Sequence, residues 1–251
     1  LEKQQITAGF IKQKTIEKGA ALCGIAPIER FINAPHGFHP TDILPQCRSV
    51  IVFASPFPIS TLSCNTNSPY TFVRNKMVEK TDQISFLLAV ELEQEGILAV
   101  PIPCAEPYDY WDESRTHGSR ILSLKHSAHL AGLGNLGKNT LLVNQTYGNM
   151  IWLGAVLVSA ELEGDSIDME TLCPSGCTLC LDKCPQHALD GKTIDQKLCR
   201  EKSISCTPGG GWVSTSILTA STSSWWGDNP RSNGSPGKRT TAHSTGFSSL
   251  I

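Results

Sequence analysis

Hydrophobic and polar residues alternate along the first 165 residues in patterns that predict helices and strands in turn. Ile6, Phe10 and Ile11 recur at helical spacing, and the apolar run 20–25 that follows has the length of a short buried strand. Residues 49–54 form a run rich in β-branched side chains that is closed by prolines. This run predicts a second strand that leaves into a loop.

The pattern continues with a helix and another strand. Thr81 and Asp82 are residues typical of an N-cap, and Ile84, Leu87, Leu88 and Leu92 lie on one face of the helix that would follow. Gly96 is the expected end of this helix. Residues 97–102 then predict the next strand.

The periodicity of residues 121–131 is helical, and residues 150–158 are apolar enough for a central strand. Helices that alternate with buried strands favour an α/β fold, in which helices cover a mixed or parallel sheet. We therefore expect one α/β domain over residues 1–165, a cysteine-rich module over 166–206 and a distinct tail over 207–251.

The tail has a composition unlike the rest of the chain. Ser, Thr, Gly and Pro make up more than half of residues 207–251, and Asp228 is the only acidic residue. Two interpretations stay open. Such a segment buries too little apolar surface to fold and is typical of a disordered, low-complexity tail. Alternatively, Trp212, Trp225 and Trp226 are unusual in a solvated linker, and a reading-frame shift near residue 206 explains them.

Composition limits the class of protein. The chain has 251 residues, 40% of them hydrophobic, and a net charge of −2 from 21 basic and 23 acidic side chains. No apolar run approaches the roughly 18 residues of a transmembrane helix, and the N-terminus lacks the apolar stretch of a secretory signal. We therefore predict a cytoplasmic protein without a membrane partner. The near-neutral charge gives no support for a nucleic-acid partner such as tRNA.

A glycine-rich segment at 132–140 imitates two phosphate-binding motifs. It satisfies G-x-G-x-x-G and nearly satisfies the P-loop pattern. Both motifs need a strand before the glycines and a helix after them, whereas here the predicted helix comes first and a strand-like run follows. Asn139 also occupies the position after Lys138 where a hydroxyl should bind Mg²⁺. The glycines therefore indicate a close approach to either another segment or a flat ligand.

The ten cysteines fall into two groups. Single, scattered cysteines are usually small buried hydrophobic residues, and four fit this description: Cys23, Cys47, Cys64 and Cys104. The other six lie between residues 173 and 206. Without an export signal a disulfide framework is not expected, so the clustered cysteines point to a metal site.

The clustered cysteines form a C-x3-C-x2-C-x3-C-P run. Its members are Cys173, Cys177, Cys180, Cys184 and Pro185. The run is one residue longer in its first gap than the bacterial ferredoxin pattern, and zinc sites more often use two C-x2-C pairs separated by a dozen residues or more. The spacing therefore favours an iron–sulfur cluster over zinc. We expect Pro185 to turn the chain into a helix over residues 186–189.

Two ligand assignments remain open. Cys184 closes a single four-thiolate cluster, or it belongs to a second cluster together with Cys199, as in two-cluster ferredoxins. After Cys199 only Cys206 remains, so the chain lacks a second complete run. The first assignment predicts one cluster, and the second predicts two clusters in an intact chain.

With these residues, the chain resembles epoxyqueuosine reductase-type iron–sulfur proteins, which are related to the corrinoid-dependent reductive dehalogenases. The resemblance covers about residues 5–205. It rests on segments 37–45, 49–52, 131–142, 152–157 and 198–200 and on the cysteine run.

The resemblance implies a nitroreductase-like α/β domain that binds a corrinoid (cobalamin), followed by a ferredoxin-type domain with two [4Fe-4S] clusters. Electrons from a donor such as ferredoxin or flavodoxin would pass from the clusters to cobalt. The founding members reduce an epoxide on a modified tRNA base. Residues that would lie against the corrinoid are Gly132, Gly134, Gly137, Lys138 and Asn139.

One family residue is missing from its expected place. The catalytic Asp should lie about a dozen residues before the glycines, but residues 116–119 contain no acid. His117 could donate a proton instead, or it is a loop histidine without a function. The sequence thus predicts a [4Fe-4S] redox protein of this family that passes electrons to a corrinoid or substrate site in the α/β domain. Whether it is an oxidoreductase acting on a small molecule or a modified base stays open. The alternatives are a ferredoxin-like electron carrier without corrinoid and a zinc-stapled structural module.

Overall fold

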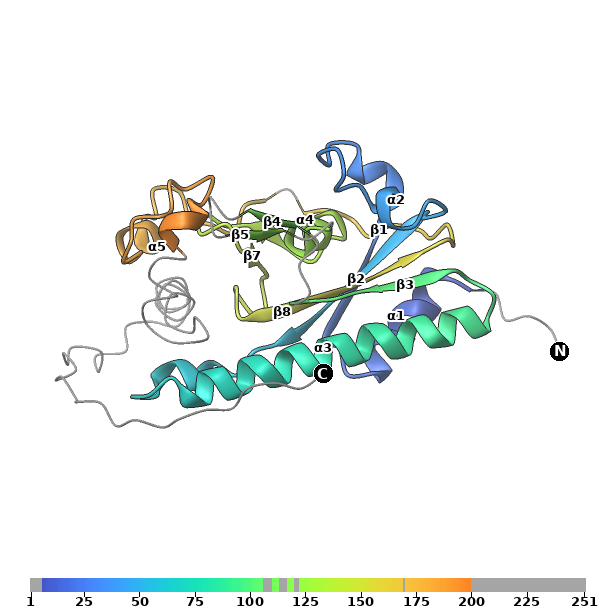
Figure 1. The fold of residues 1–251 in the computed structure, drawn as a ribbon, viewed down its shortest axis with the longest axis horizontal. Helices are drawn as coiled ribbons and strands as arrows, with labels where there is room; N and C mark the ends of the chain where they lie inside the picture. Colours follow the sequence, from blue (N-terminus) through green and yellow to red (C-terminus); the bar gives the residue numbers. More distant parts are fainter. Residues whose placement is uncertain (1–5, 106–109, 113–116, 120–121, 169, 200–251) are drawn as a thin grey trace.

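The computed structural model describes residues 6–105, 110–112, 117–119, 122–168 and 170–199. Its centre is a four-stranded sheet with the strand order β1-β2-β8-β3, as Figure 1 shows. The strands are β1 (Leu22–Pro27), β2 (Ser49–Pro56), β8 (Ile151–Val158) and β3 (Ala99–Ile102). The predicted strand at residues 150–158 is confirmed, and as β8 it lies inside the sheet.

Neighbouring strands in this sheet are antiparallel, so the expectation of a mixed or parallel sheet is wrong for the described strands. The physical reason lies in the position of β8. Both β2 and β3 run antiparallel to β8, and they therefore run in the same direction as each other. The helix between them, α3 (Ser68–Gln94), makes the crossover, but β8 is inserted between the two parallel strands, as in a split βαβ unit.

The sheet is buried on both faces, which explains why β2 is apolar at nearly every position. Ile51 and Phe53 point to one hydrophobic cluster, which includes Ile84 and Leu88 of α3. Residues of the opposite parity, such as Val52, belong to a second cluster on the other face. Helices α1 (Ala8–Glu17) and α3 cover the first face, and α4 (Leu124–Leu130) packs on the second (Figure 1).

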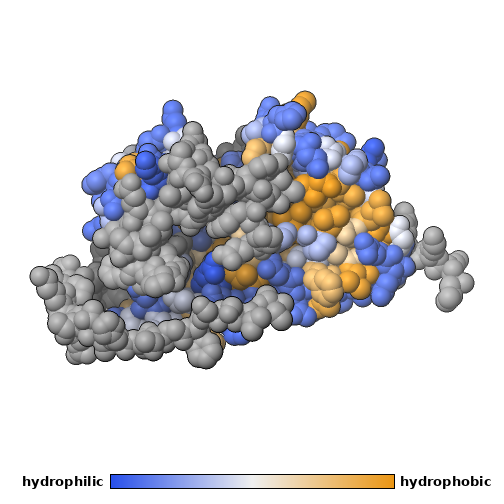
Figure 2. Space-filling model, viewed as in Figure 1, coloured by the Kyte–Doolittle hydropathy of each residue, from blue (hydrophilic) through white to orange (hydrophobic). Residues whose placement is uncertain are grey.

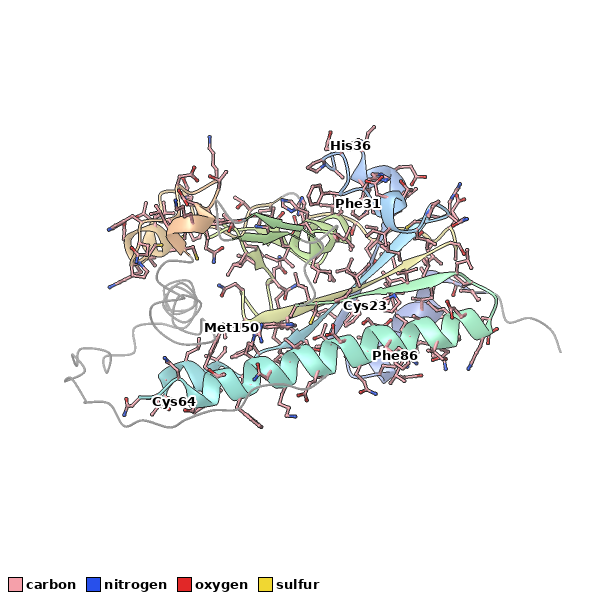
Figure 3. All side chains as sticks on the ribbon, viewed as in Figure 1. Cys23, Phe31, His36, Cys64, Phe86 and Met150 are labelled. Carbon is pink, nitrogen blue, oxygen red and sulfur yellow. The ribbon has the colours of Figure 1, made fainter. Side chains whose placement is uncertain are left out.

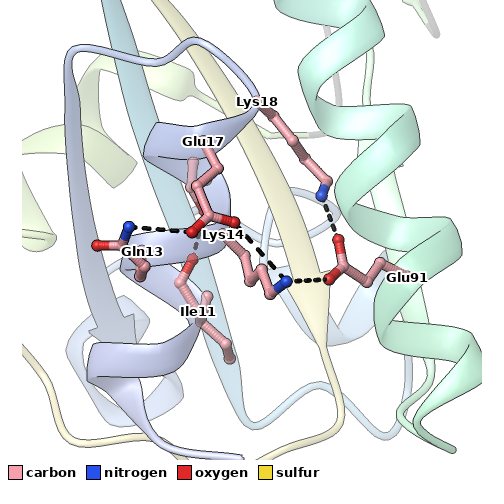
Figure 4. Close-up of polar contacts among 7 residues, drawn as sticks. Ile11, Gln13, Lys14, Glu17, Lys18 and Glu91 are labelled. Atoms are coloured by element: carbon pink, nitrogen blue, oxygen red, sulfur yellow. Dashed lines mark hydrogen bonds and ion pairs between the residues drawn. The ribbon is translucent and has the colours of Figure 1, made fainter.

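The helical spacing of Phe10 and Ile11 is confirmed by α1, which is tied to α3. The Thr7 side chain accepts a hydrogen bond from the backbone N–H of Phe10, which caps α1. Glu91 of α3 forms ion pairs with Lys14, at 3.1 Å, and with Lys18, as Figure 4 shows. The hydrogen bond from Lys18 lowers the pKa of Glu91.

The predicted start of the second helix is wrong. Thr81 is not a cap but a residue in the middle of α3, 1% exposed, where it faces Gly154 of β8. Leu87, which we placed on the apolar face, is 40% exposed. Together with Phe86 and Val90 it gives the outer side of α3 an apolar character, and Figure 2 shows apolar surface in the half of the molecule that contains these residues. Exposed apolar residues of this kind blur the periodicity from which the helix was predicted.

The remaining elements are short. Two 3-10 helices and a four-residue α-helix connect the strands: η1 (Ile28–Phe31), α2 (Pro40–Ile43) and η2 (Ile59–Ser63). Two small hairpins pair β4 (Tyr110–Asp112) with β5 (His117–Ser119), and β6 (Asn135–Leu136) with β7 (Leu142–Val143). The predicted helix 121–131 is confirmed in its centre as α4, and β7 confirms the strand-like run after the glycines.

The cysteine run lies in a small segment with its own core. Its helical turn, α5 (Leu179–Asp182), was not predicted, and the helix expected over residues 186–189 does not form. Instead His187 adopts a positive φ of 49° and Leu189 makes a β-bridge to Ile194. The buried core of this segment is Cys184, Ala188 and Leu189. The tail from 207 to 251, with both interpretations given for it, lies outside the described residues.

None of the helices in the described part of the chain combines the length and the hydropathy that a membrane crossing needs.

Candidate functional site

The glycine-rich segment forms the turn of the β6–β7 hairpin. Its backbone is closed by two hydrogen bonds, from the Gly137 N–H to the Leu141 carbonyl at 2.9 Å and from the Thr140 N–H to the Gly137 carbonyl at 2.8 Å. Thr140 adopts a positive φ of 62°, which is uncommon for a β-branched residue. Lys125 of α4 donates to the Thr140 carbonyl at 2.9 Å and so holds this conformation.

The close approach that the glycines indicate is an approach to the chain itself. A Cβ atom at Gly132 would lie 2.3 Å from the Ser166 carbonyl oxygen, and one at Gly134 would lie 2.2 Å from the Val143 carbonyl oxygen. Both glycines also have a positive φ. The backbone of the chain therefore fills the space on the Cβ side of both residues.

Asn139 and Lys138 have different environments. Asn139 is buried, and its Oδ1 accepts a hydrogen bond from the Leu141 N–H at 3.1 Å. Lys138 extends away from the hairpin, and its Nζ donates to the carbonyl oxygen of Cys177 at 2.8 Å. The structure thus joins the glycine loop to the cysteine run, which the sequence presented as separate motifs.

Three thiols of the run lie near one another. Burial raises the pKa of Cys180 above its usual range, and negative charge on Cys173 and Cys177 raises it further. The charges of Cys173 and Cys177 thus act on Cys180. All three are free thiols, with Cys180 buried and the other two half-buried. Three gathered soft ligands suit iron–sulfur chemistry.

The fourth cysteine of the run faces a different environment. Cys184 is 2% exposed, and its Sγ accepts a hydrogen bond from the Ala188 N–H at 3.3 Å. Cys199 packs against the small core that contains Cys184. The run is therefore divided into a set of three, Cys173, Cys177 and Cys180, and a pair, Cys184 and Cys199.

The spacing of the run matches the ligand set of an iron–sulfur cluster. No three His, Cys, Asp or Glu side chains in the described ranges are arranged to hold one metal ion. A cubane spreads its four ligands over a wider space, and ferredoxin-type runs supply it with three neighbouring cysteines and a fourth from elsewhere. The grouping of Cys173, Cys177 and Cys180 fits that pattern.

Three basic residues of α4 lie beside the glycine loop and were not predicted from the sequence: Lys125, His126 and His129. Burial lowers the pKa of His126, and the charges of Lys125 and His129 lower it further. The His129 ring donates a hydrogen bond through Nδ1 to the Gly134 carbonyl oxygen at 2.9 Å. Helical spacing of Lys125 and His129 in the predicted helix 121–131 was the available signal, because residues i and i+4 share a face.

The candidate proton donor His117 lies in β5. There it occupies the register position opposite Asp112 of β4. Asp112 lies outside residues 116–119, where the family's catalytic Asp was expected. The pairing of β4 with β5 was the missing signal, because it brings Asp112 opposite His117.

The four scattered cysteines do not all behave as expected. Cys47 and Cys104 are buried and Cys23 is half-buried, but Cys64 is exposed at the end of η2, so the expectation of burial is wrong for Cys64. Figure 3 shows Cys64 near the start of α3, far from Cys23 in the sheet. A hydroxyl-rich loop, rather than a strand or helix face, surrounds Cys64 in the sequence.

The amino-acid sequence is similar to those of known enzymes. No family model matches the chain. An epoxyqueuosine reductase of Gloeobacter violaceus is 27% identical over 190 residues, which are 72% of this chain and 54% of that protein. The chain resembles the epoxyqueuosine reductases. The resemblance that the motifs predicted is confirmed by this match.

Solved structures extend the likeness to the fold. The epoxyqueuosine reductase of Streptococcus thermophilus superposes with a TM-score of 0.54 at 20% identity, covering 75% of this chain and 55% of that one. The catabolic reductive dehalogenase NpRdhA, in complex with 3-bromo-4-hydroxybenzoic acid, gives a TM-score of 0.61 at 15% identity and covers 82% and 30%. The chain spans about half the length of the epoxyqueuosine reductases it matches. The α/β fold is therefore shared with both kinds of enzyme.

Proposed function

We propose that this chain is an iron–sulfur redox protein of the epoxyqueuosine reductase type, in which the cysteine run delivers electrons to the α/β body. The observation that carries the proposal is the C-x3-C-x2-C-x3-C-P run itself, in which Cys173, Cys177 and Cys180 are all free thiols. These three residues would hold a [4Fe-4S] cluster. When bound, such a cluster supplies one-electron transfer.

The division of the cysteines supports the two-cluster ligand assignment over the single-cluster one. Cys184 and Cys199 share a core from which the other three thiols are absent in the described residues. In two-cluster ferredoxins the fourth Cys of a run ligates the other cluster. We therefore propose Cys184 and Cys199 as ligands of a second site, to which the chain contributes only part of the ligand set.

The α/β body is the proposed place of substrate reduction. A reductive dehalogenase described as B12-dependent shares its fold, with a TM-score of 0.58, and this likeness supports a corrinoid in the body. The packing of Gly132 and Gly134 against the chain's own backbone gives these glycines a structural role, so the proposal of a corrinoid does not rest on them.

The substrate class follows from the relatives. An epoxyqueuosine reductase has been solved with an epoxyqueuosine-modified tRNA stem loop, and its fold matches this chain with a TM-score of 0.52. A modified base or a related small molecule is therefore the proposed substrate, and a ferredoxin or flavodoxin the proposed donor. A cytoplasmic location accords with this chemistry. Nothing in the described residues favours the ferredoxin-like carrier or the zinc-stapled module.

The proposal is tested by anaerobic reconstitution of the full chain with iron and sulfide. We expect bound iron and sulfide in equal amounts and a broad absorption that dithionite bleaches. Cys180→Ser should abolish assembly, because distant thiols cannot replace a middle ligand without rebuilding the loop. Cys23→Ser is the matched control, because Cys23 lies in β1 and not in the run, and it should load normally.

Two results would contradict the proposal. Normal iron and sulfide in Cys180→Ser would remove the run from the cluster site. A colourless protein that binds one zinc ion would support the zinc-stapled module instead. Corrinoid added to the same anaerobic preparation separates a corrinoid-dependent reductase from a simple carrier, because only the former retains it through gel filtration.

A further inference from the structure

The β6–β7 hairpin contacts the cysteine segment through two side chains. Lys138 Nζ donates to the Cys177 carbonyl at 2.8 Å, and Asn135 Nδ2 donates to the Glu170 carbonyl at 2.6 Å. The first bond joins the hairpin turn to the middle of the cysteine run. The second joins β6 to the chain just before the run begins. The hairpin therefore holds the cysteine segment at two points.

The donor groups of the two hydrogen bonds differ in charge. The Asn135 amide is neutral, whereas Lys138 carries a positive charge into a half-buried position beside the run. No ion pair among the described residues includes Lys138. A charge in a partly buried place is screened less than one in bulk water.

The turn that carries Lys138 is fixed at both ends. Two backbone hydrogen bonds close it, Asn139 holds the Leu141 N–H, and Lys125 holds the Thr140 carbonyl. A lysine on such a turn loses less freedom on making its hydrogen bond than one on a free loop. The ammonium group is therefore kept next to the loop of Cys177.

We propose that Lys138 is a positioning residue that holds the Cys177 loop and raises the reduction potential of the cluster bound by Cys173, Cys177 and Cys180. The inference rests on the proposed function. One electron from the donor enters the cluster and adds one negative charge to it. A fixed positive charge nearby stabilises this reduced form more than the oxidised form, and net charge around a cluster is one determinant of its potential.

The test compares four variants of the full chain, reconstituted anaerobically: Lys138→Met, Lys138→Gln, Lys138→Arg and Asn135→Ala. The measurements are iron content and the midpoint potential from a dithionite titration followed by electron paramagnetic resonance. Lys138→Met should load iron and show a lower potential. A tenfold weaker reduction corresponds to 59 mV for one electron. Lys138→Arg keeps the charge and should restore most of the potential.

Lys138→Gln and Asn135→Ala separate charge from docking. The amide side chain in Lys138→Gln can still donate a hydrogen bond but has no charge, so the potential of this variant should fall as in Lys138→Met. Asn135→Ala loses the neutral bond only, and its potential should match that of the wild type. An unchanged potential in both Lys138→Met and Lys138→Gln, or an equal fall in Asn135→Ala, would overturn the proposal.

Hydrogen exchange of the iron-free protein tests the docking role independently of the cluster. Amides of residues 170–180 should exchange faster in Lys138→Met and in Asn135→Ala than in the wild type. Equal exchange in all three would overturn the docking role. A wild type that binds no iron would refute the proposed function and the effect on potential, while the exchange result would still decide whether Lys138 holds the loop.

Discussion

Cys23 lies in β1 and Cys47 lies just before β2, so both thiols belong to the sheet rather than to the cysteine run. Burial raises the pKa of each from the ordinary value of 9.0 to about 11. Their protonated forms are therefore favoured in the folded protein. The stability that this difference contributes is fully present below pH 9 and is lost as the pH rises towards 11, because the unfolded chain then releases these protons first.

We expect the free energy of unfolding to fall between pH 9 and about 11 more steeply in the wild type than in Cys23→Ala/Cys47→Ala. Urea unfolding under reducing conditions at several pH values in this range measures both slopes. Cys64→Ala is the control, since Cys64 lies on the surface, and its curve should run parallel to that of the wild type. Parallel curves for the double variant would show that the two thiols do not contribute.

Residues of the candidate site could be predicted where side chains of one metal-binding type recur at a known ligand spacing within one short stretch of sequence. The ligands Cys173, Cys177 and Cys180 are of this kind, although their role stays a prediction. The contact between Lys138 and Cys177 was not predictable, because it joins residues that are 39 positions apart and depends on how two loops pack.

Secondary structure elements were predictable where burial produces a clear apolar pattern. The strands β2 and β8 are buried on both faces and read as apolar runs. Strand direction was not predictable, because an apolar run reports burial and not orientation. The first half of α3 was missed because Thr81 and Asp82 imitate a cap, although both lie inside a helix that begins at Ser68.

One contact between elements determines how the chain leaves the sheet towards the cysteine run. Asp165 accepts a hydrogen bond from the Ile25 N–H of β1 at 2.9 Å, and it also pairs with Lys12 of α1. Ile25 is fully buried, so its N–H has few alternative partners. Asp165 therefore ties the segment after β8 to the edge of the sheet.

Asp165→Ala should lower the free energy of unfolding by about 1–3 kcal/mol, because it leaves the Ile25 N–H without its acceptor. Asp165→Asn keeps an acceptor oxygen and loses only the ion pair with Lys12, so it should cost less than about 1 kcal/mol. Urea unfolding measures both values. Glu161→Gln, which breaks an exposed ion pair with Arg48, is the control and should have little effect. Equal losses in the two Asp165 variants would contradict this role.

On the scale of the whole molecule, the two parts of the chain differ in how much core they possess. The sheet has a large hydrophobic cluster on each face, whereas the cysteine segment has only three buried apolar residues in its described core. The free energy of binding the proposed cluster would therefore contribute to the folding of this segment.

We therefore expect limited proteolysis to cut iron-free protein within residues 170–199 and to spare the sheet. Loading with iron and sulfide should slow these cuts by at least about tenfold, because cleavage follows the population of the open form. Mass spectrometry of the fragments locates the cuts. Cys180→Ser should be cut equally fast with and without iron. Cleavage of the wild type at the same rate in both forms would contradict the expectation.

The position of β8 inside the sheet has a consequence for synthesis of the protein on the ribosome. Ser49 of β2 pairs with Val158 of β8, and β3 pairs only with β8 among the described strands. About 100 residues separate Ser49 of β2 from Val158 of β8, and their translation takes roughly 5–20 s. Until β8 has emerged, one edge of β2 stays unpaired, a state prone to aggregation. A nascent chain of this protein therefore needs protection until its last sheet strand has emerged, and fragments that stop before Ile151 lack the strand that joins the two halves of the sheet.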